Sequence, residues 1–340
     1  MEGRKLQLAG GSTYLVSLPK PWVTGAGLKA GDTLFLDVET DGSVSVRARS
    51  NEKATIRRKV FQEKGHDTRD HLLRKLIGAY ISGFGLIEVR FAPDQAPFVR
   101  RVAREFSRLV IGPEVIEETR NSVVIQDLSD PTELSSEKCL RRMHLTVRAM
   151  LEDAIQSLKR SDPTLAHDVA LRDQDVDRLY WMVAKQYNLT HMFPIQTRGN
   201  LSDGQAVHGH RLIAKLLERI GDHAQRIAST FDVVAKDKEI DPRLMREFEA
   251  AETSAVTLLD QAFGSLVSGD IEAANQAIDS RTSHQKLIDA LSHRVAVKKG
   301  EELLAFGTIV DSLGRVASYA ADIAEQAINM AVLTDEPGSA

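Results

Sequence analysis

The feature that most constrains the fold is an internal repeat in the second half of the chain. The segment MLEDAIQSLKRSD at residues 150–162 recurs as LLDQAFGSLVSGD at residues 258–270, an offset of 108 residues. Further on, ERIGDHAQRIAS at residues 218–229 recurs as GRVASYAADIAE at residues 314–325, an offset of 96 residues. Both copies have the apolar spacing of amphipathic helices. The sequence therefore predicts two tandem three-helix bundles, at residues 135–236 and 240–333.

The first 50 residues have the pattern of a small β unit. Gly10-Gly11 signals a hairpin turn inside LQLAGGSTYLVSLP, and TLFLDVE and SVSVRA flank a second turn signal at Thr40-Asp41-Gly42. Between the two hairpins, WVTGAGL is a short helical piece. A unit of about 45 residues buries little apolar surface by itself. We therefore expect residues 1–50 to dimerise with two-fold symmetry.

Residues 52–130 alternate between helical and strand patterns and predict a small α/β module. HLLRKLIGAYIS and PFVRRVAREFSRLV are helical in period, whereas GLIEVRF, EVIEET and SVVIQDL have strand character. The second helical segment carries four arginines on part of its surface, and a solvated helix face is their simplest interpretation: Arg100, Arg101, Arg104 and Arg108.

Composition limits the class of protein and its compartment. Charged residues make up 27% and hydrophobic residues 42% of the 340, which is ordinary for a globular chain. The single cysteine, Cys139, excludes an intramolecular disulfide and favours a reducing compartment. There is no signal-peptide pattern at the N-terminus, and no apolar run approaches the length of a membrane span. We expect a cytoplasmic protein with no membrane insertion.

Charge is distributed unevenly along the chain. Residues 1–110 hold 19 Lys and Arg against 12 Asp and Glu, whereas the remaining residues hold 25 against 36. A basic front half on an acidic back half is a reason to expect a polyanion such as DNA as a partner of the front half.

Two acid pairs in the first bundle are candidates for a metal site. Asp173 and Asp177 are four residues apart on one helix, and Glu218 and Asp222 are four apart on the next. Residues four apart share a helix face, where like charges repel. If the two helices face each other at these levels, four carboxylates converge and require a cation. Oxygen ligands suit magnesium, calcium, manganese or iron.

Other side chains near the acids leave alternatives open. Participation of His223, or of the pair His208 and His210, would favour iron or zinc. Conversely, the acids are neutralised on a solvated face if nearby basic residues pair with them: Arg172, Arg178, Arg211, Lys215 and Arg219.

The second bundle lacks the acids. The positions that match Asp173 and Asp177 hold Arg281 and Gln285, and those that match Glu218 and Asp222 hold Gly314 and Ser318. The absence of all four acids fits the loss of a whole site from the second bundle. It fits equally well a helix face that has no function in either bundle.

Motifs for catalysis are missing from the sequence. There is no glycine-rich phosphate loop, HExxH motif or nucleophile elbow. A metal-dependent enzyme built on the acids is the weakest interpretation, because no nucleophile or substrate pocket can be identified.

Three helical motifs resemble the PhoU family of phosphate-uptake regulators. They are LLERIGDHAQRIAS in the third helix of the first bundle, RDQDVDRL in its second helix, and GRVASYAADIAE in the second bundle. The resemblance implies a pair of three-helix bundles in which E/DxxxD motifs bind metal clusters of iron or zinc. Carried over, the metal ligands are Asp173, Asp177, Glu218 and Asp222, with manganese or magnesium as other candidate ions. It also implies contact with a phosphate ABC transporter.

The front of the chain resembles the AbrB/SpoVT-type swapped-hairpin DNA-binding domain. The similar stretch is RKLQLAGGSTYLVSLPKPWVTGAGLKAGDTLFLDVETDGSVSVRA, and the resemblance implies a swapped-hairpin β-barrel. Relatives often carry an arginine between the glycine and the proline of the first hairpin, whereas STYLVS has no basic residue. The candidate DNA contacts are therefore Arg4, Lys5, Lys20 and Arg47, with Ser12 and Thr13 as neutral donors.

Together the two resemblances are typical of archaeal PhoU-related regulators. They imply a homodimeric transcriptional regulator of phosphate uptake that binds DNA through the front and senses through metal or a partner protein. A regulator that acts by protein contact with the transporter, without DNA binding, is the alternative.

Overall fold

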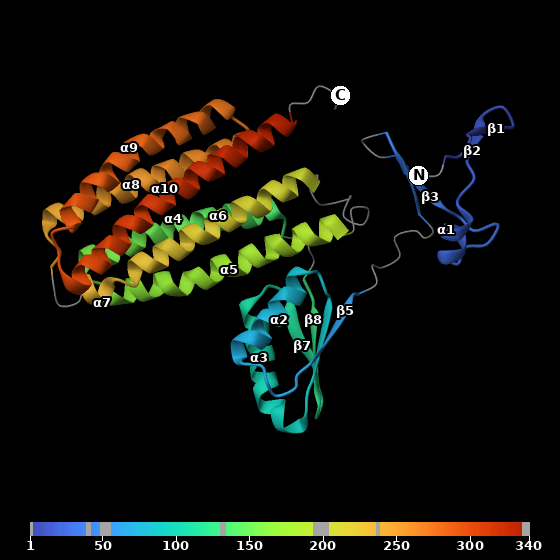
Figure 1. The fold of residues 1–340 in the computed structure, drawn as a ribbon, viewed down its shortest axis with the longest axis horizontal. Helices are drawn as coiled ribbons and strands as arrows, with labels where there is room; N and C mark the ends of the chain where they lie inside the picture. The colour runs from blue at the N-terminus through green and yellow to red at the C-terminus, as the bar shows by residue number, and fades with distance from the viewer. Residues whose placement is uncertain are drawn as a thin grey trace. The chain divides into compact units, whose positions relative to one another are not determined.

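The computed structural model describes residues 3–38, 42–47, 56–129, 134–192, 204–235 and 239–334. The chain divides into two compact units, Met1–Thr55 and Ile56–Ala340, and each is described by itself. Figure 1 shows the elements of both.

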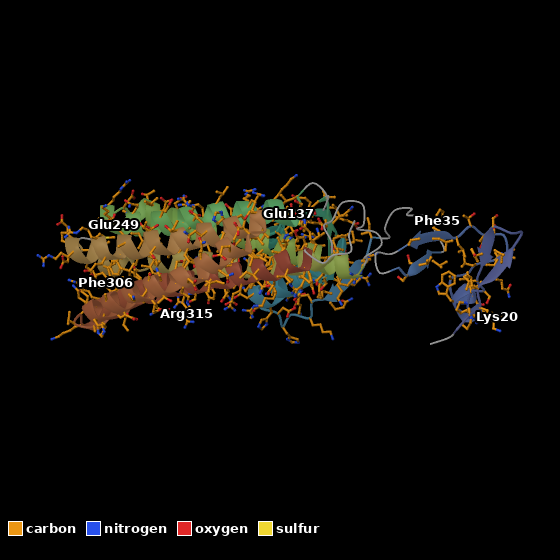
Figure 2. The ribbon with its side chains drawn as sticks, turned by 90° about the horizontal axis from the view of Figure 1, so that it is seen from above. Lys20, Phe35, Glu137, Glu249, Phe306 and Arg315 are labelled. Carbon is orange, nitrogen blue, oxygen red and sulfur yellow. The ribbon has the colours of Figure 1, made fainter. Side chains whose placement is uncertain are left out.

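The front unit consists of two hairpins and a short helix. Strands β1 (Gln7–Ala9) and β2 (Thr13–Leu15) pair antiparallel across Gly10 and Gly11, whose φ angles of 61° and 82° suit a turn. Helix α1 (Lys20–Gly25) carries a proline in its first turn, where a missing N–H costs nothing. Strands β3 (Phe35–Val38) and β4 (Val44–Arg47) form the second hairpin, and part of its predicted turn lies outside the described residues. Figure 2 labels Lys20 and Phe35 on separate elements of this unit.

The expected β-barrel is not closed within one chain. Among the described residues, the two hairpins remain separate two-stranded sheets, and none of their side chains is buried. A barrel requires every strand edge to be paired, and strands of three or four residues leave these edges open.

The middle module is a four-stranded sheet with helices on one face. Its strands β5 (Arg58–Gln62), β6 (Leu86–Arg90), β7 (Pro113–Glu118) and β8 (Ser122–Asp127) follow the order β5-β6-β8-β7. Only the β5–β6 pair is parallel, as expected for strands joined through a helix. Helices α2 (Arg69–Ile81) and α3 (Ala96–Leu109), the latter preceded by the 3₁₀ turn η1 (Pro93–Gln95), cover the core.

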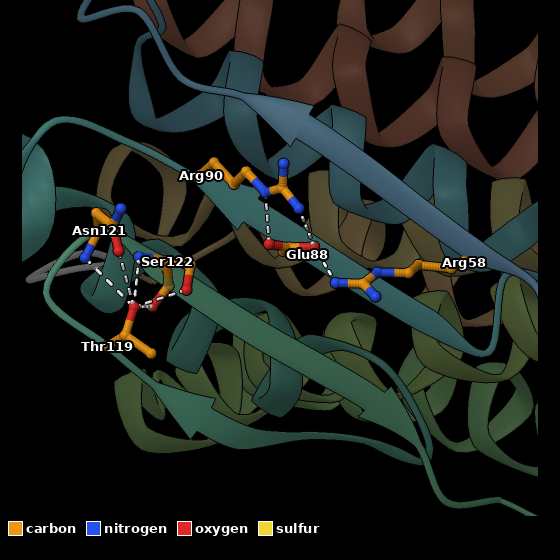
Figure 3. A network of polar contacts seen from close by, with 6 residues as sticks. All are labelled: Arg58, Glu88, Arg90, Thr119, Asn121 and Ser122. Atoms are coloured by element: carbon orange, nitrogen blue, oxygen red, sulfur yellow. Dashed lines mark hydrogen bonds and ion pairs between the residues drawn. The ribbon is translucent and has the colours of Figure 1, made fainter.

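The sequence patterns of this module are confirmed apart from one strand. Strand β5, RKVFQ, was not expected, because three of its five residues are polar or charged and it forms a sheet edge. On the sheet face away from the helices, buried Glu88 accepts hydrogen bonds from Arg58 and Arg90 (Figure 3). These two guanidinium groups lower the pKa of Glu88, with Arg90 contributing most.

Two three-helix bundles form the helical half. The first contains α4 (Ser136–Arg160), α5 (Pro163–Met192) and α6 (Gly204–Ala228), followed by the short α7 (Phe231–Val234). The second contains α8 (Pro242–Ser268), α9 (Ile271–Val295) and α10 (Gly300–Thr334). Asp241 and Asp270 cap the N-termini of α8 and α9, and Gly269 ends α8 in the left-handed conformation.

The bundles share one continuous core rather than two separate ones. Helix α6 packs against α10, and α4 packs against α8, so the apolar stripes of both repeats merge. The stripe expected on α6 is fully buried: Leu217, Ile220, Ala224 and Ile227. No described helix is long and apolar enough to cross a membrane.

The middle module docks on α5 through buried polar contacts. The Lys185 ammonium pairs with Asp127 at the end of β8 and lies 3.0 Å from the Ser129 hydroxyl oxygen. The Tyr80 hydroxyl, close to Met182, donates to the carbonyl of Ile111. No local sequence pattern predicts this interface, although Lys185 follows the apolar pair Val183-Ala184 and is itself buried.

Candidate functional site

The four predicted metal ligands occupy neighbouring positions on α5 and α6. Burial of Val176 and Leu217 fixes the rotation of the two helices, and the acids lie half-buried at the margin of the core. Gly221 on α6 faces these acids, since a Cβ there would stand 3.4 Å from Asp173 Oδ1.

The carboxylates influence one another electrostatically. Burial, followed by the charges of Asp222 and Glu218, raises the pKa of Asp173 to about 6. Burial and all three neighbouring acids raise the pKa of Asp177 to about 7. The pKa of Asp222 is raised as well, first by burial and then by Glu218. Assembling these acids on one face therefore carries an electrostatic cost that protonation or a cation would relieve.

Most nearby cations are engaged elsewhere. Only Lys215 forms an ion pair with one of the four acids, at 2.5 Å from Glu218 Oε1. Among the described residues, basic side chains therefore do not neutralise all four carboxylates. The other four basic residues contact different partners: Arg172 pairs with Asp153 and Asp168, Arg178 with Asp175, Arg211 stacks on Tyr187, and Arg219 on Tyr319.

The histidines do not join the acids. His223 Nδ1 lies 3.1 Å from Ser312 Oγ on α10, and His210 Nδ1 lies 2.8 Å from Ser136 Oγ on α4. Burial lowers the pKa of both imidazoles. His208 contacts the ring of Tyr187. In this arrangement the three histidines therefore contact Ser136, Tyr187 and Ser312 rather than the acids.

The donor set fits a hard cation by its chemistry. Carboxylate oxygens suit magnesium, manganese or iron(III) better than a soft ion. As the side chains stand, no three His, Cys, Asp or Glu groups in the described part of the chain are close enough together to hold an ion. Binding at the four acids would therefore require the carboxylates to reorient.

The matching face of the second bundle has different chemistry. Gln285 donates to Asp289 on its own helix at 2.8 Å, and the Ser318 hydroxyl donates to the carbonyl of Gly314 at 3.1 Å. Arg281 opposes the effect of burial on the pKa of Asp322, so cation and anion are mixed on this face.

The candidate DNA contacts are distributed over the front unit. Arg4 and Lys5 precede β1, whereas Ser12 and Thr13 lie at the turn, the opposite end of the same hairpin. Lys20 begins α1, and Arg47 ends β4. The five whose side chains the structure describes are exposed, and they do not form one continuous patch on the first hairpin.

Large apolar side chains on the front unit are also exposed. Leu8 and Tyr14 are direct cross-strand partners, 60% and 66% exposed. On the second hairpin Leu36 is 67% and Val38 78% exposed. Within the front unit, these side chains are therefore left uncovered.

Two segments of the chain match family models. Residues 140–231 match the family model described as PhoU domain, and residues 7–54 match the model described as "Antidote-toxin recognition MazE, bacterial antitoxin". The first helical bundle is thus similar to a PhoU domain, and the front unit is similar to a MazE-type domain. No curated protein sequence matches the chain significantly.

Two solved structures share the fold of the helical half. PhoU from Pseudomonas aeruginosa is 19% identical with a TM-score of 0.51, covering 58% of this chain and 96% of its own. The phosphate transport system regulatory protein PhoU from Streptococcus pneumoniae is 16% identical with a TM-score of 0.50, covering 57% and 92%. The predicted PhoU-like fold is confirmed.

Proposed function

We propose that this chain is a phosphate-responsive transcriptional regulator. The observation that carries the proposal is the presence of a PhoU domain and a MazE/AbrB-type domain in one chain. The front unit binds DNA as a homodimer, and the helical half senses the signal. The acids have no catalytic role in this proposal.

DNA binding is tested with the full chain and the DNA upstream of phosphate-transport genes. Fluorescence anisotropy with and without phosphate and metal, against an unrelated duplex of equal length, measures affinity and specificity. Replacement of Arg4 and Lys5 by alanine should weaken binding to both duplexes and lower the salt slope by about one unit per lost phosphate contact. Absence of binding to any duplex at low salt would favour the alternative, a regulator that contacts a phosphate ABC transporter directly.

Dimerisation through the front unit would cover its exposed apolar side chains. Val38→Asp places a charge on the second hairpin, where burial without a partner is costly. We expect the wild-type chain to be dimeric in light scattering and Val38→Asp to be monomeric at the same concentration. Leu304→Asp is the matched control, because Leu304 is 72% exposed on α10. A wild-type monomer at micromolar concentration would contradict the proposal.

The sensing element in this proposal is a cation held by Asp173, Asp177, Glu218 and Asp222. Three of the four have raised pKa values, and none of those three forms a direct ion pair among the described residues, although Lys215 acts on Asp177 and Asp222 at longer range. A divalent or trivalent ion would supply the missing charge and link α5 to α6. Because α5 also carries the middle module, such a link would reach the front half of the chain.

A further inference from the structure

Helix α3 of the middle module presents an arginine-lined groove to solvent. Its opposite side buries Val99, Val102, Ala103 and Phe106, so the rotation of the helix is fixed. The groove is lined by Pro97, Arg100, Arg101, Arg104, Glu105 and Arg108.

Two of these arginines are held in place by the β7–β8 hairpin. Arg100 Nη2 donates to the carbonyl of Thr119 at 2.5 Å, and Arg104 Nη2 lies 2.9 Å from Glu118 Oε1. Hydrogen bonds among Thr119, Asn121 and Ser122 fix that turn (Figure 3). One side of the groove is therefore preorganised.

The other two arginines have uncompensated charge. Arg101 and Arg108 are exposed, and neither has a carboxylate partner within the described ranges. Glu105, the one acid in the groove, accepts from Arg69 instead. By contrast, Arg58 and Arg90 on the sheet face are both paired with Glu88 (Figure 3).

We propose that Arg101 and Arg108 bind backbone phosphates of duplex DNA. Guanidinium groups bind phosphate oxygens in a bidentate fashion, and lysine is missing from this helix. Seven residues of helix span about 10 Å, close to the axial length of three nucleotides of one strand. Pro97 is the only apolar side chain in the groove, and a protein interface would require an apolar centre.

The inference rests on the proposed DNA binding and extends it to a second surface. The front unit offers few basic side chains, and contacts from the middle module would add affinity without reading sequence. A phosphate contact should therefore increase the affinity for the DNA upstream of phosphate-transport genes and for an unrelated duplex by the same factor.

The test compares the full chain with the variant Arg101→Ala/Arg108→Ala on both duplexes over a range of salt concentrations. We expect binding to weaken about tenfold on each duplex and the salt slope to fall by about two units. The control Arg243→Ala/Arg246→Ala removes the same charge from exposed positions on α8 and should bind like wild type. Unchanged melting of both variants excludes a folding defect.

Two results would overturn the inference. If the Arg101/Arg108 variant keeps wild-type affinity and slope while Arg4→Ala/Lys5→Ala loses them, the front unit alone binds DNA and the groove faces solvent or an acidic protein. If the wild-type chain binds no duplex at low salt, the proposed DNA binding fails together with this inference.

Discussion

The two helical bundles repeat one arrangement of helices, but their second helices have different surroundings. Helix α5 is covered by its own bundle and by the middle module, where Lys185 is buried. Helix α9 buries a single stripe, and His293, at the position that matches Lys185, is exposed. The acids also occur only on the first bundle. The difference shows that the same arrangement of helices carries clustered acids and a docked module in one copy and neither feature in the other.

The largest expected effect concerns the contact that distinguishes α5 from α9. Lys185→Ala leaves the buried Asp127 carboxylate unpaired and should lower the free energy of unfolding by about 3–5 kcal/mol. Urea denaturation measures this. His293→Ala, the matched change on α9, should stay within about 0.5 kcal/mol. The double variant Lys185→Met/Asp127→Leu should recover most of the loss, and equal stability of wild type and Lys185→Ala would show that the pair does not hold the module.

The next effect tests whether burial and the neighbouring acids of α5 and α6 make the Asp177 charge unfavourable. Asp177→Asn removes a carboxylate whose pKa is raised to about 7. In metal-free protein at pH 8 the variant should be more stable than wild type, because it lacks the unfavourable charge. The expected gain in free energy of unfolding is roughly 1–3 kcal/mol, since partial exposure to solvent screens the charge. Asp175→Asn, which changes an exposed carboxylate near Arg178, is the control and should have little effect. If Asp177→Asn is less stable than wild type, a cation compensates the negative charge of the Asp177 carboxylate.

The pH dependence of wild-type stability follows from the same shifts. The folded-state pKa values of Asp173 and Asp177, about 6 and about 7, exceed the ordinary value of 3.8. Their favourable contribution is complete at acid pH and is lost as the pH rises through the folded values. Buried histidines with lowered pKa values act in the opposite direction in both proteins, so the difference between wild type and Asp177→Asn isolates the carboxylate. In chelator, the melting temperature of wild type relative to that of Asp177→Asn should fall between pH 5 and pH 8. A melting temperature that rises across this window in wild type but not in the variant would contradict the shifts.

The smallest effect concerns the close approach of α5 and α6. The residue that matches Gly221 in the second bundle is Ala317. A Cβ at Gly221 would lie 3.4 Å from Asp173 Oδ1 and 3.5 Å from Val147 Cγ1 and Val176 Cγ1, which are ordinary contacts, so Gly221→Ala should stabilise the fold by up to about 1 kcal/mol. Gly307→Ala on α10 is the control, because a Cβ there would have no atom within 4 Å. Its stability change measures the higher helix propensity of alanine alone. If Gly221→Ala lowers stability while Gly307→Ala raises it, the first bundle has no room for a Cβ at residue 221.

The helical half could be predicted because its signal is local and periodic. The stripe from Leu217 to Ile227 is spaced for one helix face, and every member is buried. The closed barrel does not form among the described residues, because the two short hairpins stay separate two-stranded sheets with unpaired outer edges. Strand β5 was missed, since an edge strand has neither a continuous apolar run nor a clean alternation.

The sequence predicts where the four acids lie, but it does not predict which partners the nearby basic residues take. Spacing placed Asp173 and Asp177 on one face, and this follows from helix geometry alone. Where the neighbouring cations go depends on tertiary contacts, such as Arg172 reaching Asp153 on α4. The Lys185–Asp127 pair joins residues 58 apart, and no local pattern reports such a pair.

One measurement addresses the central claim, that the first bundle and not the second holds a cation. Metal-free protein is titrated with iron, zinc, manganese and magnesium, and bound metal and melting temperature are followed for wild type, Asp222→Asn and Ser318→Asn. Because a ligand of the folded state stabilises by mass action, the melting temperature of wild type and Ser318→Asn should rise with at least one metal. Asp222→Asn should bind less metal and gain less stability. If no metal binds to wild type or shifts its melting temperature, the acids are a repulsive surface and not a sensor.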